Sequence, residues 1–109
     1  MAFKLSISTP DRTFFEGEAD ELVAPGLAGS FGVLARHAPM ICALGAGVLK
    51  ARIDGAVRLF VIDSGTAEVA HDQVAILADQ LQEASDPADA EQKLQSVATA
   101  EQMRSTLTH

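Results

Sequence analysis

The chain has 109 residues, of which 48% are hydrophobic, and this is enough apolar material for one small folded domain. Its 15 acidic and 8 basic residues give a formal net charge of −7. Binding to nucleic acid needs clustered Lys and Arg, so the charge argues against that class of partner. Arg36, Lys50, Arg52 and Arg58 stand apart from an acidic stretch at 11–21, and this separation suits a partner protein as well as a solvated surface.

The only cysteine, Cys42, lies in an apolar segment at 40–44 and has no partner for an internal disulfide. We expect a small buried thiol at this position, in preference to a reactive one. No stretch approaches the roughly 20 apolar residues of a membrane span, and the first residues lack the apolar region of a signal peptide. The sequence therefore predicts a protein of a reducing, cytosol-facing compartment.

Alternating apolar and polar residues predict β-strands as far as residue 78. Turns are expected at Glu16-Gly17-Glu18, at Pro25-Gly26 and at Asp54-Gly55, and the last is the strongest hairpin signal. The expected strands cover residues 3–8, 12–15, 19–24, 40–44, 48–53, 56–62, 66–70 and 73–78. The buried sides of the first and last strands are formed by Phe3, Leu5, Ile7, Val74, Ile76 and Ala78. This succession of short strands predicts an all-β sandwich or barrel.

A glycine-rich segment follows the second predicted turn. Gly26, Gly29 and Gly32 allow the backbone to take positive φ or to approach a neighbour closely, and Phe31 supplies an apolar anchor. We therefore expect an ordered loop. The segment lacks the Gly-Lys-Ser/Thr ending of a phosphate-binding loop and precedes a strand instead of a helix, so no cofactor site is predicted there.

The last part of the chain predicts a helix. Ser85-Asp86-Pro87 offers a capping residue followed by proline at the first helical position, and the helix should run from about 87 to 107. Its apolar face is narrow, because Glu101 interrupts it, so we expect weak docking on the sheet or on a partner. The apolar positions of this face are Ala90, Leu94, Val97, Ala98, Met103 and Leu107.

Catalytic and metal-binding constellations are weak in this sequence. His37, Asp63 and Ser64 could be written as a triad, but no nucleophile elbow surrounds Ser64. The adjacent His71-Asp72 pair should point its side chains apart, and His109 is terminal, so no metal site is predicted. For His37, a structural role with a backbone hydrogen bond is favoured over a contact to a partner.

The segment 26–49 matches a family pattern. Gly26, Gly29 and Gly32 begin a run of the form G-x-x-G-x-x-G-V-L-x-x-H-A-P-h-h-x-x-L-x-x-G-V-L, where h is apolar. This run closely resembles the amino-terminal domain of the epsilon subunit of F-type ATP synthases. Agreement outside the run is found at 5–10, 15–18, 24–26, 64–69 and 74–79, so the resemblance covers about residues 3 to 84.

The resemblance implies a mainly β fold, with a ten-stranded β-sandwich of two five-stranded sheets at 1–84 and one short helical segment at 85–109. It also implies a non-catalytic central-stalk subunit that couples proton-driven rotation to ATP synthesis, without cofactor or metal. Its partners would be the gamma subunit and the ring of c subunits, with no nucleic acid. Contact with the membrane would come only through the complex, at the cytoplasmic face of the bacterial inner membrane. The alternative is a β-sandwich protein-binding module that serves another assembly.

The same resemblance assigns two contact regions. The loop facing the c-ring would comprise Gly26, Leu27, Ala28, Gly29, Ser30 and Phe31. The region facing gamma would comprise His37, Ala38, Pro39 and Met40.

The sequence departs from the family pattern at several points. Ser30 stands where many members have an acid, and Arg36 where glycine is frequent. Thr66 and Ala67 replace a glycine and a phenylalanine in the later strand. Family members continue into two helices and some bind ATP, but here only one helix fits and Gln92 replaces the arginine of the ATP motif. We therefore expect no regulatory ATP site and a weak or absent inhibitory role for the helix.

Overall fold

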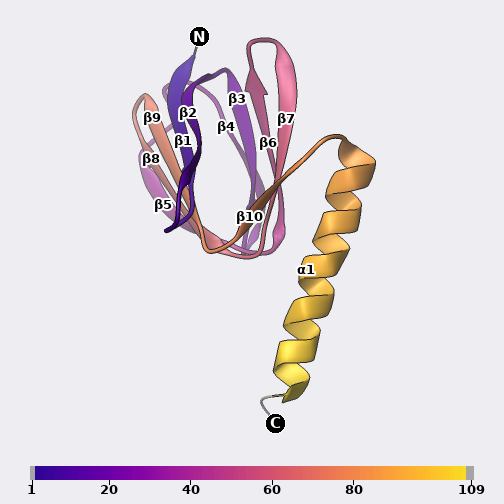
Figure 1. The fold of residues 1–109 in the computed structure, drawn as a ribbon. Helices are drawn as coiled ribbons and strands as arrows, with labels where there is room; N and C mark the ends of the chain where they lie inside the picture. The colour runs from indigo at the N-terminus through magenta and orange to yellow at the C-terminus, as the bar shows by residue number, and fades with distance from the viewer. Residues whose placement is uncertain (1, 108–109) are drawn as a thin grey trace.

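A computed structural model describes the backbone of residues 2–107 and the side chains of residues 2–97. Ten strands are followed by one helix, and the described part measures 47 × 27 × 26 Å (Figure 1). The elements are β1 (Phe3–Ser8), β2 (Thr13–Ala19), β3 (Glu21–Gly26), β4 (Gly29–Val33), β5 (Met40–Leu44), β6 (Gly47–Ile53), β7 (Ala56–Ile62), β8 (Gly65–Ala70), β9 (Gln73–Ala78), β10 (Leu81–Ala84) and α1 (Pro87–Leu107).

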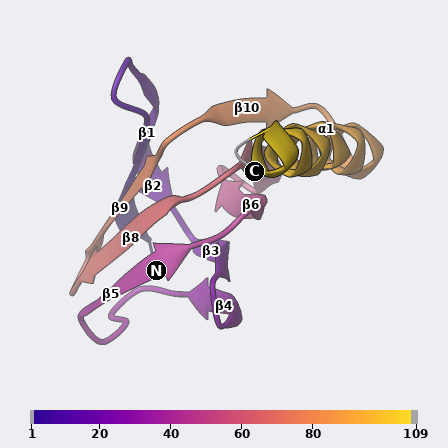
Figure 2. The ribbon, with the colours of Figure 1, turned by 90° about the horizontal axis from the view of Figure 1, so that it is seen from below.

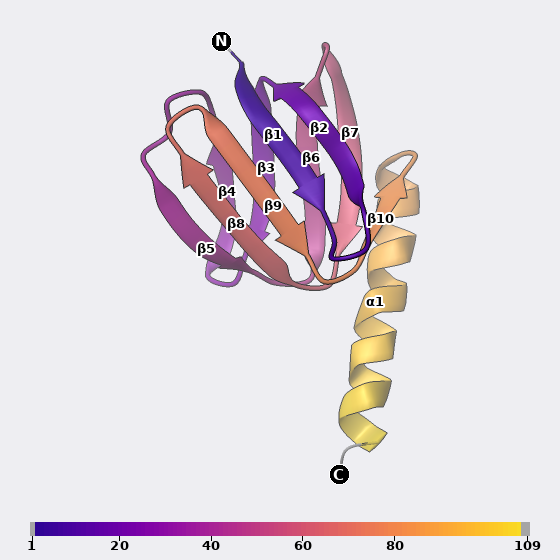
Figure 3. The ribbon, with the colours of Figure 1, turned by 60° about the vertical axis from the view of Figure 1, so that its left-hand side comes forward.

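The strands form two five-stranded layers (Figures 2 and 3). One layer has the order β4-β3-β6-β7-β10, and the other has the order β5-β8-β9-β1-β2. Neighbouring strands are antiparallel except β1 and β9, which are parallel. A single antiparallel pair, Gly26 with Leu44, joins the layers into one curled sheet. The expected β-sandwich of two five-stranded sheets is confirmed.

The core lies between the layers and is built from every second residue of each strand. The inward sides expected for the first and last predicted strands are confirmed, because Phe3, Leu5, Ile7, Val74, Ile76 and Ala78 are all buried. The Asp54-Gly55 hairpin is also confirmed: both residues have positive φ, 53° and 78°, as a tight two-residue turn between β6 and β7 requires.

Two expected turns are wrong. Glu16-Gly17-Glu18 lies inside β2, where Glu16 pairs with Ser6 and Glu18 pairs with Lys4. These glutamates lie on the exposed side of an edge strand, and polar residues on both sides of a glycine are also typical of turns. Pro25-Gly26 belongs to β3, and the chain turns at the next two residues instead.

The strand β10 was not predicted. It has only four residues, and its two middle residues, Gln82 and Glu83, are polar and exposed. Leu81 and Ala84 are buried, and the strand pairs with β7. So short a segment carries too few alternations to be separated from the polar turn before it.

The layers approach each other closely at the Gly26–Leu44 pair. The backbone N–H of Leu27 donates to the carbonyl of Ala43 (3.1 Å), and the N–H of Gly45 donates to the carbonyl of Pro25 (2.9 Å). A Cβ on Gly26 would lie 2.7 Å from the carbonyl oxygen of Gly29. Glycine is therefore required at Gly26 by its close approach to Gly29 within the β3–β4 hairpin, at the corner where the two layers also join.

The opposite side of the sandwich is closed by Arg58. Its guanidinium donates to both carboxylate oxygens of Glu83 on β10, at 2.8 and 3.2 Å. It also lies over the rings of Phe15 on β2 and Phe60 on β7, 5.2 and 5.3 Å from their centroids. One side chain thus connects the edges of both layers.

The helix α1 begins and ends at the predicted residues. The side chain of Asp86 caps it by accepting from the N–H of Asp89 (2.7 Å). Ala90 is buried against Leu59, Val61 and Ala84 on the outer face of β7 and β10. The side chains of the later part of the predicted apolar face, from Ala98 onward, lie outside the described residues. Within the described part of the chain, no helix is both long and apolar enough to cross a membrane.

Replacing Arg58 by alanine should destabilise the sandwich by about 1–2 kcal/mol, because a partly exposed ion pair and two cation–π contacts are lost together. Arg58→Lys should restore little of this, since lysine lacks the planar fork. The free energy of urea unfolding measures the change, and a double-mutant cycle with Glu83→Ala separates the ion pair from the ring contacts. An unfolding free energy unchanged in Arg58→Ala would show that Arg58 does not close the sandwich.

Replacing Ala90 by glutamate should detach α1 while leaving the sandwich folded, because an unpaired charge would enter the apolar contact with Leu59 and Val61. Ala88→Glu is the matched control, since Ala88 is exposed in the same turn of the helix. Amide hydrogen exchange should show faster exchange in α1 for Ala90→Glu alone. Equal protection of α1 in both variants would contradict the docking described above.

Candidate protein-interaction site

The two contact regions inferred from the sequence lie at opposite ends of β4 (Figure 3). The region 26–31 includes the turn between β3 and β4, and the region 37–40 follows β4 at its other end. The turn residues Leu27 and Ala28 precede β4 and residues 37–40 follow it, so the five-residue strand, about 17 Å long, lies between the turn and that segment. The regions are therefore two separate surfaces, connected by one strand.

The region 26–31 is the tip of a hairpin and not an open loop. Only Leu27 and Ala28 lie in the turn, and Gly29 has a positive φ of 135°. The side chain of Leu27 is 73% exposed, although its backbone N–H is bonded to Ala43 across the join. The ring of Phe31 packs against the core. This arrangement presents an apolar side chain on a backbone held in place.

The region 37–40 is an irregular segment between β4 and β5. Arg36, just before it, has a positive φ of 64°. His37 is half-buried, and its Nδ1 lies 2.7 Å from the carbonyl oxygen of Ala38, to which it donates. This contact agrees with the structural role favoured for His37. Met40 packs against the core, so Ala38 and Pro39 are the exposed members of the region.

The strand β5 exposes a residue that the sequence analysis missed. Ile41 is 76% exposed, while Met40, Cys42 and Leu44 point to the interior side of the strand. Cys42 is only half-buried, so the expectation of a buried thiol is wrong. Cys42 is not fully buried because β5 is the last strand of its layer and one side of the strand is open. The alternation was hidden because outward and inward residues are both apolar.

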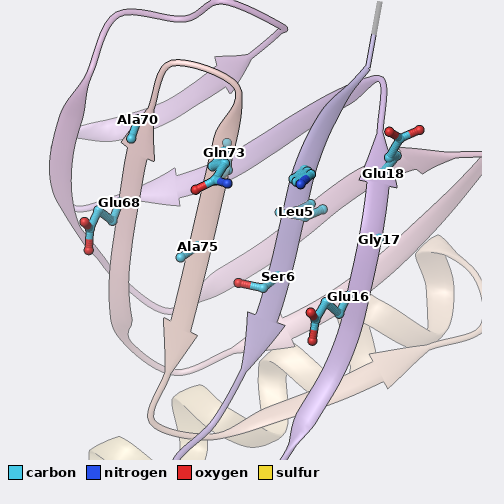
Figure 4. A pocket seen from close by; sticks show the side chains of 11 residues that line it. Leu5, Ser6, Glu16, Gly17, Glu18, Glu68, Ala70, Gln73 and Ala75 are labelled. Atoms are coloured by element: carbon cyan, nitrogen blue, oxygen red, sulfur yellow. The ribbon is translucent and has the colours of Figure 1, made fainter.

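A shallow depression of ≈ 590 Å³ lies on the outer face of β1, β2, β8 and β9 (Figure 4). Glu16, Glu18 and Glu68 stand around it, and the small side chains of Ala70 and Ala75 form part of its floor. Its carboxylates are exposed, and α1 covers the outer face of the other layer only. Lys4 also lines the depression, which is therefore part of an open sheet face with more acidic than basic side chains.

The rejected triad is not assembled. His37 lies at one end of the sandwich, whereas Asp63 and Ser64 form the turn between β7 and β8 at the other end. One oxygen of Asp63 accepts from the backbone N–H of Ser64 (2.7 Å) and of Gln80 (3.0 Å). The hydroxyl of Ser64 donates to Asp79. These groups fasten two neighbouring turns to each other.

The His71-Asp72 pair differs from its expected geometry. The side chains do not point apart, because Nε2 of His71 lies 3.5 Å from a carboxylate oxygen of Asp72. His71 has a positive φ of 35° in this turn between β8 and β9. Among the described residues, no group of three or more His, Cys, Asp and Glu side chains could hold a metal ion. His109, the third residue considered, lies outside the described residues.

The segment that most resembles the family's ATP motif, around Asp89 and Gln92, makes hydrogen bonds within the chain. The carboxylate of Asp89 accepts from Lys93 (2.6 Å) and from the backbone N–H of Ser85 (2.9 Å). The hydrogen bond from Lys93 is the main reason that the pKa of Asp89 is lowered, and the bond from Ser85 adds to it. The ionised carboxylate therefore holds the helix start until the pH falls through this lowered pKa. Gln92 is exposed beside it.

Comparison with protein families gives a match over residues 2–84 to the family described as "ATP synthase, Delta/Epsilon chain, beta-sandwich domain". The chain is 38% identical over 96 residues to the chloroplastic ATP synthase epsilon chain of Pyropia yezoensis, covering 86% of this chain and 72% of that one. It is 42% identical over 83 residues to the epsilon chain of Dehalococcoides mccartyi (strain CBDB1), covering 76% and 59%. The matched part thus spans 72% and 59% of the length of these two relatives.

Comparison of folds gives a chain in the structure of the Euglena gracilis mitochondrial ATP synthase, OSCP/F1/c-ring. The TM-score is 0.71 with 19% sequence identity, and the match covers 84% of this chain and 72% of that chain. This likeness shows that the fold is shared. Because the family match spans all ten strands and the relatives in sequence are epsilon chains, the chain belongs to the ATP synthase delta/epsilon family, as an epsilon subunit of the F type.

Proposed function

We propose that this chain is a non-catalytic subunit of the central stalk of an F-type ATP synthase. In that place it couples rotation of the membrane ring of c subunits, through the gamma subunit, to ATP synthesis in the catalytic head. The observation that carries the proposal is the pair of uncharged surfaces at opposite ends of β4, on a sandwich of the epsilon family. A subunit between two partners needs two separate contact surfaces on one rigid body.

The hairpin tip at 26–31 is the surface for the c-ring. Leu27 is exposed, and its backbone is held by the join between the layers, so a force on the tip passes directly into both sheets. Ser30 is exposed beside it and carries no charge. Contact with the ring at this tip therefore depends on shape and apolar area, without an ion pair from Ser30.

The segment 37–40 is the surface for gamma. The hydrogen bond of His37 to Ala38 shapes this segment, and Ala38 and Pro39 present its exposed side. Ile41 follows directly and adds a large exposed apolar side chain. An apolar patch of this kind favours a permanent protein contact over a transient one.

The sandwich of residues 1–84 carries both contacts, and the helical segment of residues 85–109 is a separate part with at most a weak effect on ATP hydrolysis. The docked Ala90 keeps the start of α1 on the sheet. The protein lies at the cytoplasmic face of the bacterial inner membrane and is held there by the complex alone. This division follows the family pattern of the sequence.

Replacing Ala38 by glutamate should weaken binding to the cognate gamma subunit by about tenfold or more, because a charge would be buried at the contact. Ala56→Glu is the matched control: Ala56 is also an exposed alanine, at the start of β7. Affinity is measured by titration of purified gamma with the full chain. Failure of the unaltered chain to bind gamma would favour the alternative, a binding module of another assembly.

Replacing Leu27 by aspartate should reduce coupling while leaving the gamma complex intact, because the hairpin tip would meet the ring with a charge. Val57→Asp is the control, since Val57 is also an exposed apolar residue (57%) but lies on β7, outside the hairpin tip. Proton pumping per ATP hydrolysed is measured in inverted vesicles that contain the assembled enzyme. Equal coupling in the two variants would refute the role of the hairpin tip.

A further inference from the structure

Within the described structure, neither backbone conformation nor close packing explains why residue 32 is glycine. Two of the eight glycines have positive φ, namely Gly29 and Gly55. At five others a Cβ would lie within 3.1 Å of another atom, namely Gly17, Gly26, Gly45, Gly47 and Gly65. Gly32 has no positive φ, and a Cβ there would meet only the carbonyl oxygen of Leu22, at 4.0 Å. A glycine inside a strand weakens that strand, and it frequently marks a place where another backbone approaches closely.

The strand that contains Gly32 has a free edge. Within the described backbone, β4 pairs with β3 alone (Figure 2). Ser30 is opposite Pro25, which has no N–H and whose carbonyl accepts from Gly45 on the far side of β3. The Pro25–Ser30 pair is therefore one of the non-hydrogen-bonded pairs of the ladder. By alternation, Ser30 and Gly32 direct their backbone N–H and C=O groups to the free edge.

The outer strands β2 and β10 are protected in the usual ways, whereas β4 is not. The open side of β5 also lacks a charge and a proline, but the end of β5 is already paired with β3 through Leu44 and Gly26. The outer strand β2 carries Glu16 and Glu18 and pairs with β1 through a bulge. The outer strand β10 has only four residues and includes Glu83. The sequence of β4, Gly-Ser-Phe-Gly-Val, contains neither a charge nor a proline. An unprotected edge invites pairing with a strand of another chain.

We propose that an extended strand of the gamma subunit adds to the free edge of β4, with main-chain hydrogen bonds to Ser30 and Gly32. This inference rests on the proposed function and specifies how gamma binds. The strand β4 leads directly to the segment 37–40, which is the proposed gamma surface, and Leu34 between them is 58% exposed. A second copy of this chain is a poorer occupant, because both copies carry a net charge of −7.

The test uses the full chain and its cognate gamma subunit. Gly32→Pro removes the N–H that faces the free edge and also fixes φ and adds a ring there, a change that an edge strand tolerates. We expect the thermal midpoint of the isolated chain to be preserved and its affinity for gamma to fall about tenfold or more.

Glu18→Pro is the matched control. The N–H of Lys4, opposite Glu18, donates to Asp72, so Glu18 likewise directs its N–H to a free edge, that of β2. This variant should bind gamma with unchanged affinity.

Amide hydrogen exchange on the unaltered chain gives a second readout that needs no variant. Binding of gamma should slow exchange at Ser30 and Gly32 about tenfold or more, whereas Phe31 between them, hydrogen-bonded to β3, should change little. The edge proposal is overturned, while the stalk role stands, if gamma binds the unaltered chain but both amides still exchange freely. It is also overturned if Gly32→Pro binds gamma with the same affinity as the unaltered chain. Absence of gamma binding by the unaltered chain overturns both. If the Ser30 amide is protected from exchange without gamma, and more strongly at higher protein concentration, the edge is occupied by a second copy of this chain. That result would overturn the proposal.

Discussion

The two layers are joined at one backbone pair, between Gly26 and Leu44, and the positions of both candidate surfaces follow from that pair. Two further backbone bonds, from Leu27 to Ala43 and from Gly45 to Pro25, hold the corner closed. Close approach between strands of one layer requires glycine at 26 and 47, where a Cβ would collide with the carbonyl oxygen of Gly29 and with the side chain of Pro25. Within the described backbone, β4 pairs only with β3, and β5 pairs with β8 and, at this corner, with β3, so each strand is the margin of its own layer.

This geometry gives the sandwich three features that protein partners can use. The hairpin tip exposes Leu27 on a fixed backbone, the segment 37–40 exposes Ala38 and Pro39, and the edge of β4 connects the two. The opposite side is closed by Arg58, and α1 packs on the outer face of β7 and β10. A rotor subunit that transmits force between two partners needs this combination of a closed side and an exposed one.

Local signals in the sequence predicted much of the fold. Alternation identified most strands, the Asp54-Gly55 pair identified its hairpin, and Asp86 identified the start of α1. The parallel pairing of β1 with β9 could not be predicted, because it joins segments far apart in the chain. At the site, the spacing of the glycines suggested an ordered segment, but the exposure of Ile41 and the free edge at Gly32 depend on which strand lies beside which. Which strands become neighbours in the sheet is not encoded in any local sequence pattern.

The most direct test of the account is a cryo-EM structure of the ATP synthase purified through a tag on this chain. The account predicts density for the sandwich between gamma and the c-ring, with the hairpin tip at Leu27 against the ring and the segment at Ala38 against gamma. A complex in which the sandwich contacts neither partner, or in which these two ends are reversed, would contradict it.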